Sequence, residues 1–107
     1  MIDWQRVNEL RTEVGEDDFP EIVTVFLEEV DEVIDRLSTS GAVSAAPDDM
    51  HFLKGSARTL GFSEMAELCR KGELVEKGHP AARISPVIAA YQRERSELLE
   101  RSGIALP

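Results

Sequence analysis

The sequence contains a single cysteine, Cys69, among its 107 residues. One cysteine excludes an intrachain disulfide and a thiolate metal cluster, and it fits a reducing compartment. The chain also lacks an apolar run of the roughly 20 residues that a membrane span needs. Residues 1–5 show no cationic leader followed by an apolar stretch. We therefore expect a cytoplasmic protein without a membrane anchor, in which Cys69 is a small core residue.

Basic residues are scarce, with 12 Lys and Arg against 21 Asp and Glu and a formal net charge of −9. Nucleic acids and anionic membranes require clustered Lys and Arg, so the composition argues against both as partners. Protein partners with a basic or neutral rim remain compatible with this charge. The chain also lacks the G-x-x-x-x-G-K-[ST] motif and other glycine-rich nucleotide loops. We therefore expect it neither to bind ATP nor to phosphorylate itself.

No stretch alternates with the two-residue period of a β-strand. Apolar residues instead recur at spacings of three and four, most regularly from Phe19 to Leu37. The length allows one domain, residues 1–107. We predict an all-α fold, an antiparallel four-helix bundle with a short N-terminal helix, capped by Asp3, across its end. The bundle helices are predicted at about 18–38, 47–61, 63–77 and 85–102.

Two features of the C-terminal half bear on these boundaries. The last helix has two possible starts, at Pro80 or at the Ser85-Pro86 pair. The charged run 92–95 interrupts its apolar positions, so we expect this helix to be only partly covered. Residues 77–80 read as a turn in which His79 is a surface residue, and His79 and His51 make no recognisable metal-ligand spacing.

The most informative stretch is residues 47–61, with the sequence PDDMHFLKGSARTLG. Pro47 suits the first position of a helix, and the two aspartates that follow suit its first turn. Gly61 stands where a left-handed C-cap is usual. The stretch therefore predicts one helix with a clear start and stop.

At about 100° per residue, one flank of this helix is apolar and His51 points the other way. Lys54, Gly55 and Arg58 follow His51 by three, four and seven residues, so they are its neighbours on the exposed face. Glycine inside a helix costs about 1 kcal/mol relative to alanine, so its presence asks for a reason. A bare patch beside the imidazole would let another molecule approach closely.

This arrangement suggests a phosphoryl group carried on a histidine nitrogen. Neutral imidazole is nucleophilic near pH 7. Lys54 and Arg58 are placed to stabilise an anion attached to His51. The phosphoryl group would be delivered and removed by partner proteins.

Residues 51–61, HFLKGSARTLG, resemble the H-x-L-K-G-S-A-x-x-L-G signature of histidine-containing phosphotransfer (HPt) domains, and every fixed position of that pattern is met. Leu68, Cys69 and Glu73 are also similar to the following helix of that family. HPt domains are helical-bundle intermediates of phosphorelays, so the resemblance implies the same bundle here. It also implies that His51 is phosphorylated, that Lys54 stabilises the phosphate, and that Gly55 leaves the gap for an incoming receiver domain.

The implied partners are receiver domains and a hybrid histidine kinase, and we expect a monomer. The receiver supplies the acidic pocket and the Mg²⁺, so the chain is expected to need no cofactor or metal of its own. Arg58 stands at a variable position of the pattern, so its role comes from geometry alone. Phe52 and Thr59 lie on one shoulder of the His51 face as candidate partner contacts, although Phe52 has packing against the first helix as an equal alternative.

Other classes of function stay open at this point. One alternative is that the chain is the phosphoacceptor module of a larger, chemotaxis-type histidine kinase, although a start at Met1 and an end soon after the last helix favour a free-standing protein. A non-catalytic adaptor that binds receivers would need no nucleophile, which His51 provides. A metal-dependent helical hydrolase is disfavoured because no paired His and carboxylate ligands lie on facing stripes.

Overall fold

The computed structural model describes residues 1–41, 46–75 and 84–106. These residues form the helices α1 (Trp4–Val14), α2 (Phe19–Thr39), α3 (Pro47–Leu60), α4 (Ser63–Val75) and α5 (Ser85–Ser102). Within the described ranges the extended pairing is confined to an isolated bridge between Ile2 and Phe62. The prediction of an all-α fold is confirmed.

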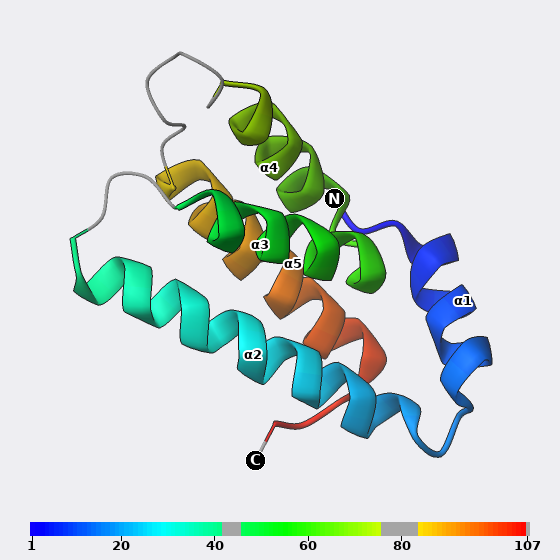
Figure 1. Cartoon of the computed structure of the whole chain (residues 1–107). Coiled ribbons are helices and arrows are strands. Elements are labelled where there is room, and N and C mark those ends of the chain that lie inside the picture. Colours follow the sequence, from blue (N-terminus) through cyan, green and yellow to red (C-terminus); the bar gives the residue numbers. More distant parts are fainter. Residues whose placement is uncertain (42–45, 76–83, 107) are drawn as a thin grey trace.

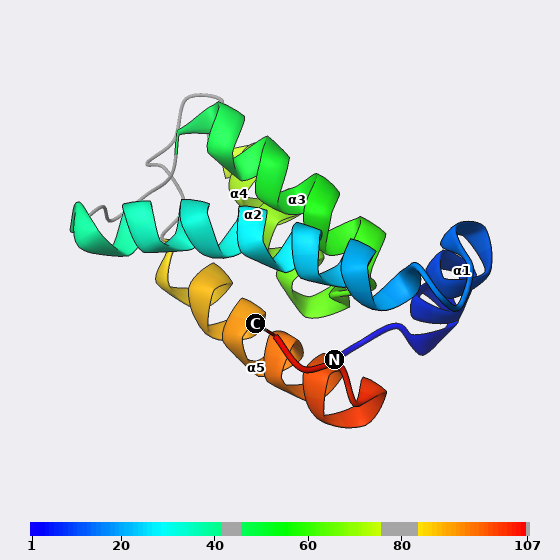
Figure 2. The same cartoon turned by 90° about the horizontal axis from the view of Figure 1, so that it is seen from below.

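Helices α2 to α5 form a bundle in which each helix runs opposite to the one before it (Figure 1). Figure 2 shows the same bundle from below, with α1 again at one end and its axis across the others. This is the end at which α2 begins and α3 finishes. The short N-terminal helix therefore packs across the end of the bundle, as its sequence predicts.

The core is built from one face of each helix, most continuously along α2. The buried residues of α2 are Phe19, Val23, Leu27, Val30, Ile34 and Leu37. The carboxylates on the other side of α2 are exposed, namely Glu21, Glu28, Glu29, Glu32 and Asp35. Spacings of three and four thus separate a buried stripe from an acidic outer face. Cys69 on α4 is also fully buried, as expected.

Helix α5 has the predicted bounds, and the other boundaries that can be compared within the described residues differ from the predicted ones by at most one residue. Helix α2 begins and ends one residue later than predicted. Helix α5 begins at Ser85 with Pro86 in its first turn, so the second of the two possible starts is correct. The predicted last residues of α4, the turn at 77–80 with His79, and the other possible start of α5 lie outside the described residues.

The expected interruption of the apolar face of α5 by residues 92–95 was wrong at Glu94. This side chain is only 2% exposed. Its carboxylate accepts hydrogen bonds from the backbone N–H of Met65 at 2.9 Å and of Glu64 at 3.3 Å. First-turn amides have no partner within their own helix, so Glu94 acts as a cap for α4 supplied by α5. A charged residue is buried here because it satisfies these donors.

A second polar cluster joins α2 to α5. The hydroxyl of Tyr91 donates to Oδ1 of Asp31 at 2.6 Å, and Nη2 of Arg95 donates to Oδ2 of Asp31 at 2.8 Å. Burial of the Tyr91 ring, followed by its hydrogen bond to the Asp31 carboxylate, raises the pKa of Tyr91 well above its ordinary value. The cluster therefore holds the phenol neutral.

Among the helices that the structure describes, none combines the length and the apolar character needed to cross a bilayer.

Candidate functional site

Helix α3 carries the candidate site, and its ends are built as the sequence predicts. Pro47 lies in the first turn, where its missing N–H is not needed, and two aspartates follow it. Gly61 ends the helix in the left-handed conformation, with φ 78° and ψ 21°. Its N–H bonds back to the carbonyls of Ala57 and Arg58.

The buried side of α3 consists of Met50, Leu53, Ser56, Ala57 and Leu60. On the other side, His51, Gly55 and Arg58 are exposed and Lys54 is half-buried. Residues three or four apart on a helix have Cβ atoms about 5–6 Å apart, which sets the spacing of Lys54 from His51. Arg58 is seven residues from His51, which is a rise of about 10 Å along the helix. The structure thus brings the four residues to one face, with Lys54 nearer to His51 than Arg58.

Gly55 faces open space. A Cβ atom built on it would meet nothing within 4 Å outside its own helix. Gly61, the second glycine of the motif, is different, because its Cβ would lie 2.7 Å from the backbone oxygen of Asp3. Packing and backbone conformation therefore explain the glycine at 61, whereas neither explains the glycine at 55.

The two shoulder residues, Phe52 and Thr59, are both half-buried. Phe52 packs against the hydrophobic core, so part of its ring is committed inside the molecule. The Thr59 hydroxyl donates to the carbonyl of Gly55 at 3.0 Å. The Thr59 carbonyl accepts a hydrogen bond from Nε of Arg6 at 3.2 Å. Thr59 thus connects the site helix to α1.

The acidic residues at the start of α3 do not share one environment. Asp49 is turned toward α2, where its Oδ1 accepts from Nη2 of Arg36 at 2.7 Å. Asp48 is exposed. The Asp49–Arg36 pair fastens the first turn of α3 to α2.

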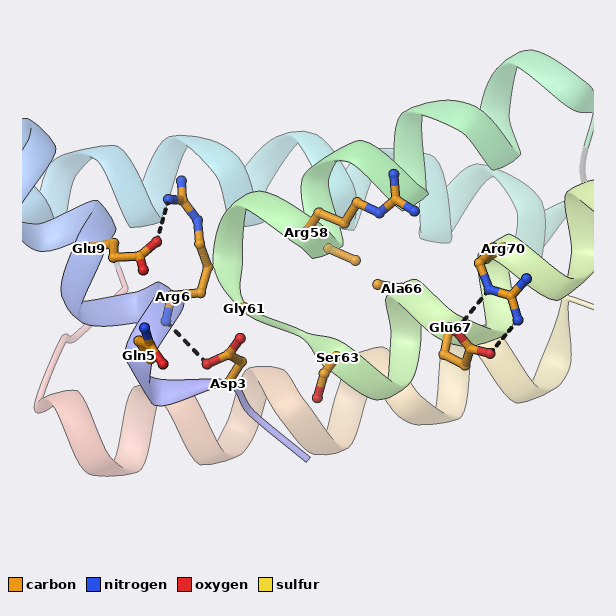
Figure 3. Close-up of a pocket in the computed structure, with 11 residues that line it drawn as sticks. Asp3, Gln5, Arg6, Glu9, Arg58, Gly61, Ser63, Ala66, Glu67 and Arg70 are labelled. Carbon is orange, nitrogen blue, oxygen red and sulfur yellow. Dashed lines mark hydrogen bonds and ion pairs between the residues drawn. The ribbon is translucent and has the colours of Figure 1, made fainter.

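Next to this face is a recess that sequence reasoning missed. It lies between α1, α3 and α4 and has a volume of about 420 Å³ (Figure 3). Its polar walls include Arg6 and Glu9 from α1, Arg58 from α3, and Glu67 and Arg70 from α4. These residues are far apart in the chain, and no spacing rule connects them, so the sequence offered no signal for the recess.

Within residues 1–41, 46–75 and 84–106, no three His, Cys, Asp or Glu side chains are grouped so as to hold a metal ion.

A family model described as Hpt domain matches residues 21–101 of the chain. The match includes all of α3 and α4 and most of α2 and α5, whereas α1 lies outside it. No curated protein and no solved structure matches the chain significantly.

Proposed function

The chain belongs to the Hpt domain family, and from this premise we propose that His51 carries a phosphoryl group between a donor and the aspartate of a receiver domain. Hpt domains serve histidine phosphotransfer in phosphorelays, where they interact with receiver domains and kinases. The donor proposed here is a phosphorylated receiver or a hybrid histidine kinase. The acceptor is a second receiver.

The observation that carries this proposal is the open surface at Gly55, one helical turn from His51. Glycine in a helix interior lowers stability by about 1 kcal/mol relative to alanine. Nothing inside the described molecule compensates for this loss, because no neighbouring atom lies within 4 Å of the Cβ position. A partner that must bring its own backbone close to the imidazole supplies the missing reason. An exposed histidine beside such a gap suits transfer between two proteins.

The proposed transfer is a displacement at phosphorus. A neutral ring nitrogen of His51 forms a bond to phosphorus as the bond to the donor's carboxylate oxygen breaks, so the donor aspartate regains its carboxylate. Loss of the proton on the other ring nitrogen leaves the imidazole ring neutral and the phosphoryl group anionic, and transfer to the next receiver reverses these steps. Lys54 offsets charge on the phosphoryl oxygens, an effect of about 1 kcal/mol at an exposed site.

The chain is proposed to act as a carrier and not as a kinase. The receiver brings the Mg²⁺ and the acidic pocket, which stabilise the same phosphoryl group from the other side. The exposed edge of Phe52 and the Thr59 shoulder would contact the docked receiver. Arg58, two turns from His51, would add positive potential without contacting the transferring group. A cytoplasmic location and a monomeric state are part of the proposal.

The proposal is tested by incubating the protein with a panel of phosphorylated receiver domains and Mg²⁺. Acid-labile phosphate is expected on the wild-type chain and absent from a His51→Gln variant. Binding of receivers without any transfer would instead favour an adaptor. Labelling of the His51→Gln variant at the wild-type rate would remove His51 from the reaction.

A further inference from the structure

We propose that the recess between α1, α3 and α4 is a recognition subsite for the docked receiver, which takes an acidic side chain of that receiver in contact with Arg58. This inference rests on the proposed function, since it assumes that a receiver docks over His51. It adds a second contact region that selects which receiver docks.

Arg58 is the arginine that the structure leaves uncommitted. Every other arginine in the described ranges pairs with a carboxylate or lies over an aromatic ring. In Figure 3 the guanidinium of Arg58 has no hydrogen bond or ion pair to the other residues drawn, although its charge contributes to lowering the pKa of Glu67. An exposed arginine with five donors and no acceptor is well suited to a carboxylate from another molecule.

The other two arginines that line the recess already have carboxylate partners. Arg70 donates to both carboxylate oxygens of Glu67, at 2.9 and 2.6 Å. Hydrogen bonding by Arg70 is the main reason that the pKa of Glu67 is lowered, so this pair stays charged near pH 7. Arg6 lies 3.3 Å from Glu9. Arg58 is therefore the cation of the recess whose donors suit an incoming acid, and the carboxylates of Asp3 and Glu9 lie at the other end, beside α1.

Figure 3 shows how the side chains around the recess are arranged. Arg58 extends along the α3 wall, away from Arg6 and Glu9, and Asp3 lies at the opposite end from Arg70. Because Arg58 and His51 share the exposed side of α3, a partner that covers His51 can reach the recess without leaving this surface. The two regions are therefore continuous.

The α1 wall is firmly attached to the site helix. The N–H of Asp3 donates to the carbonyl of Gly61 at 2.7 Å, and Arg6 donates to the carbonyl of Thr59 at 3.2 Å. The side chain of Asp3 also caps α1 by accepting from the N–H of Arg6. A preorganised wall loses little freedom on binding, which favours a recognition role.

The same wall lies outside the residues that the family model matches, which begin at 21. The His51 motif lies inside the match and the α1 half of the recess does not. The recess is therefore built only partly from the residues that the family model matches.

The test fills the recess with a large side chain. Ala66 on α4 is half-buried and lines the recess, so Ala66→Tyr blocks it. Ala89 on α5 is also half-buried and lines a groove there, which makes Ala89→Tyr the matched control. The urea midpoints of both variants are measured first, to establish that each variant is folded. The phosphotransfer assays are then run without urea at equal concentrations of folded protein.

Two phosphodonors separate recognition from chemistry. Phosphoramidate is small and needs no docking: its P–N bond breaks, a P–N bond to His51 forms, and ammonia leaves. The receiver that labels the wild type fastest is the second donor. Ala66→Tyr is expected to raise the half-saturating concentration of that receiver about tenfold, the effect of losing one charge-assisted hydrogen bond, and to leave the phosphoramidate rate within about twofold. Ala89→Tyr is expected to change neither.

A charge variant provides the second reading. Arg58→Gln is expected to raise the half-saturating concentration of the same receiver by a similar factor. The double variant Arg58→Gln/Ala66→Tyr is expected to need no more receiver than the worse single variant, because both substitutions remove the same contact. The subsite proposal is overturned if Ala66→Tyr has the wild-type half-saturating concentration, or if the effects of the two substitutions on that concentration are fully additive in the double variant. If the wild type gains no phosphate from either donor, the proposed function itself fails, and that outcome is distinct from a failure of the recess alone.

Discussion

Replacing Gly55 by alanine is expected to make the protein more stable and less active. Alanine is favoured over glycine in a helix interior by about 1 kcal/mol, and the new methyl group meets no atom within 4 Å beyond the backbone of its own helix. The hydrogen bond that the Thr59 hydroxyl donates to the Gly55 carbonyl does not involve the new methyl group. We expect the free energy of unfolding to rise by about 0.5–1 kcal/mol.

The same methyl group enters the space that the receiver is proposed to occupy. Overpacking a fitted contact costs about 1–3 kcal/mol, which corresponds to a roughly five- to 150-fold loss in kcat/KM for transfer from a phosphorylated receiver. The phosphoramidate reaction at His51 needs no docked protein and is expected to change little. The longer side chain of a Gly55→Gln variant is expected to lower kcat/KM further.

Urea unfolding and rapid-quench phosphotransfer measure the two effects on the same preparations. Opposite signs, with stability up and transfer down, are the predicted result. A Gly55→Ala variant that transfers at the wild-type rate would refute the idea that Gly55 is kept for the partner. A less stable variant would show that the glycine serves the fold after all.

Three further perturbations test the structure around the site. Gly61→Ala is expected to lower the free energy of unfolding by about 2 kcal/mol or more, because Gly61 has a positive φ and its Cβ would lie 2.7 Å from the Asp3 oxygen. Urea unfolding of this variant and of Gly55→Ala measures the contrast. An unchanged urea midpoint in Gly61→Ala would contradict the prediction. Glu94→Ala is expected to lower the free energy of unfolding by about 2 kcal/mol, because it leaves first-turn amides of α4 without a cap. Amide hydrogen exchange in that turn should then lose its protection, and protection at the wild-type level would contradict the prediction. Tyr91 is the single tyrosine, so ultraviolet absorbance measures its ionisation directly. Because the pKa of Tyr91 is raised in the folded protein, its contribution to stability is complete below the unfolded pKa of about 10 and falls by about 1.4 kcal/mol per pH unit above it. Tyr91→Phe should remove this slope, and phenolate formation in the native protein near pH 10 would contradict the assignment.

Much of the fold could be predicted because it depends on local signals. The 3.6-residue period of the α2 stripe, the proline and glycine at the ends of α3, and the Asp3 cap all act within a few residues of their own position. The placement of His51, Lys54 and Gly55 on one face follows from the same helical geometry. Their chemical roles are a prediction that the phosphotransfer experiments test.

The rest depends on contacts between distant residues. Charge alone suggested that Glu94 is exposed. It is buried because its carboxylate accepts hydrogen bonds from the backbone amides of Met65 and Glu64, about 30 residues away. The recess needs Arg6, Arg58 and Arg70 from three helices, which only the packed bundle brings together. Periodicity states which face of a helix is buried but not which residue lies opposite it.

The central claim is that His51 carries the phosphoryl group, and locating that group tests it most directly. The protein is phosphorylated by its fastest receiver, kept at neutral pH, and analysed by peptide mass spectrometry with phosphorus NMR of the intact chain. The account predicts one phosphoramidate, on His51, that is lost when acceptor receiver and Mg²⁺ are added. A phosphoryl group on another residue, or one on His51 that no receiver removes, would contradict it.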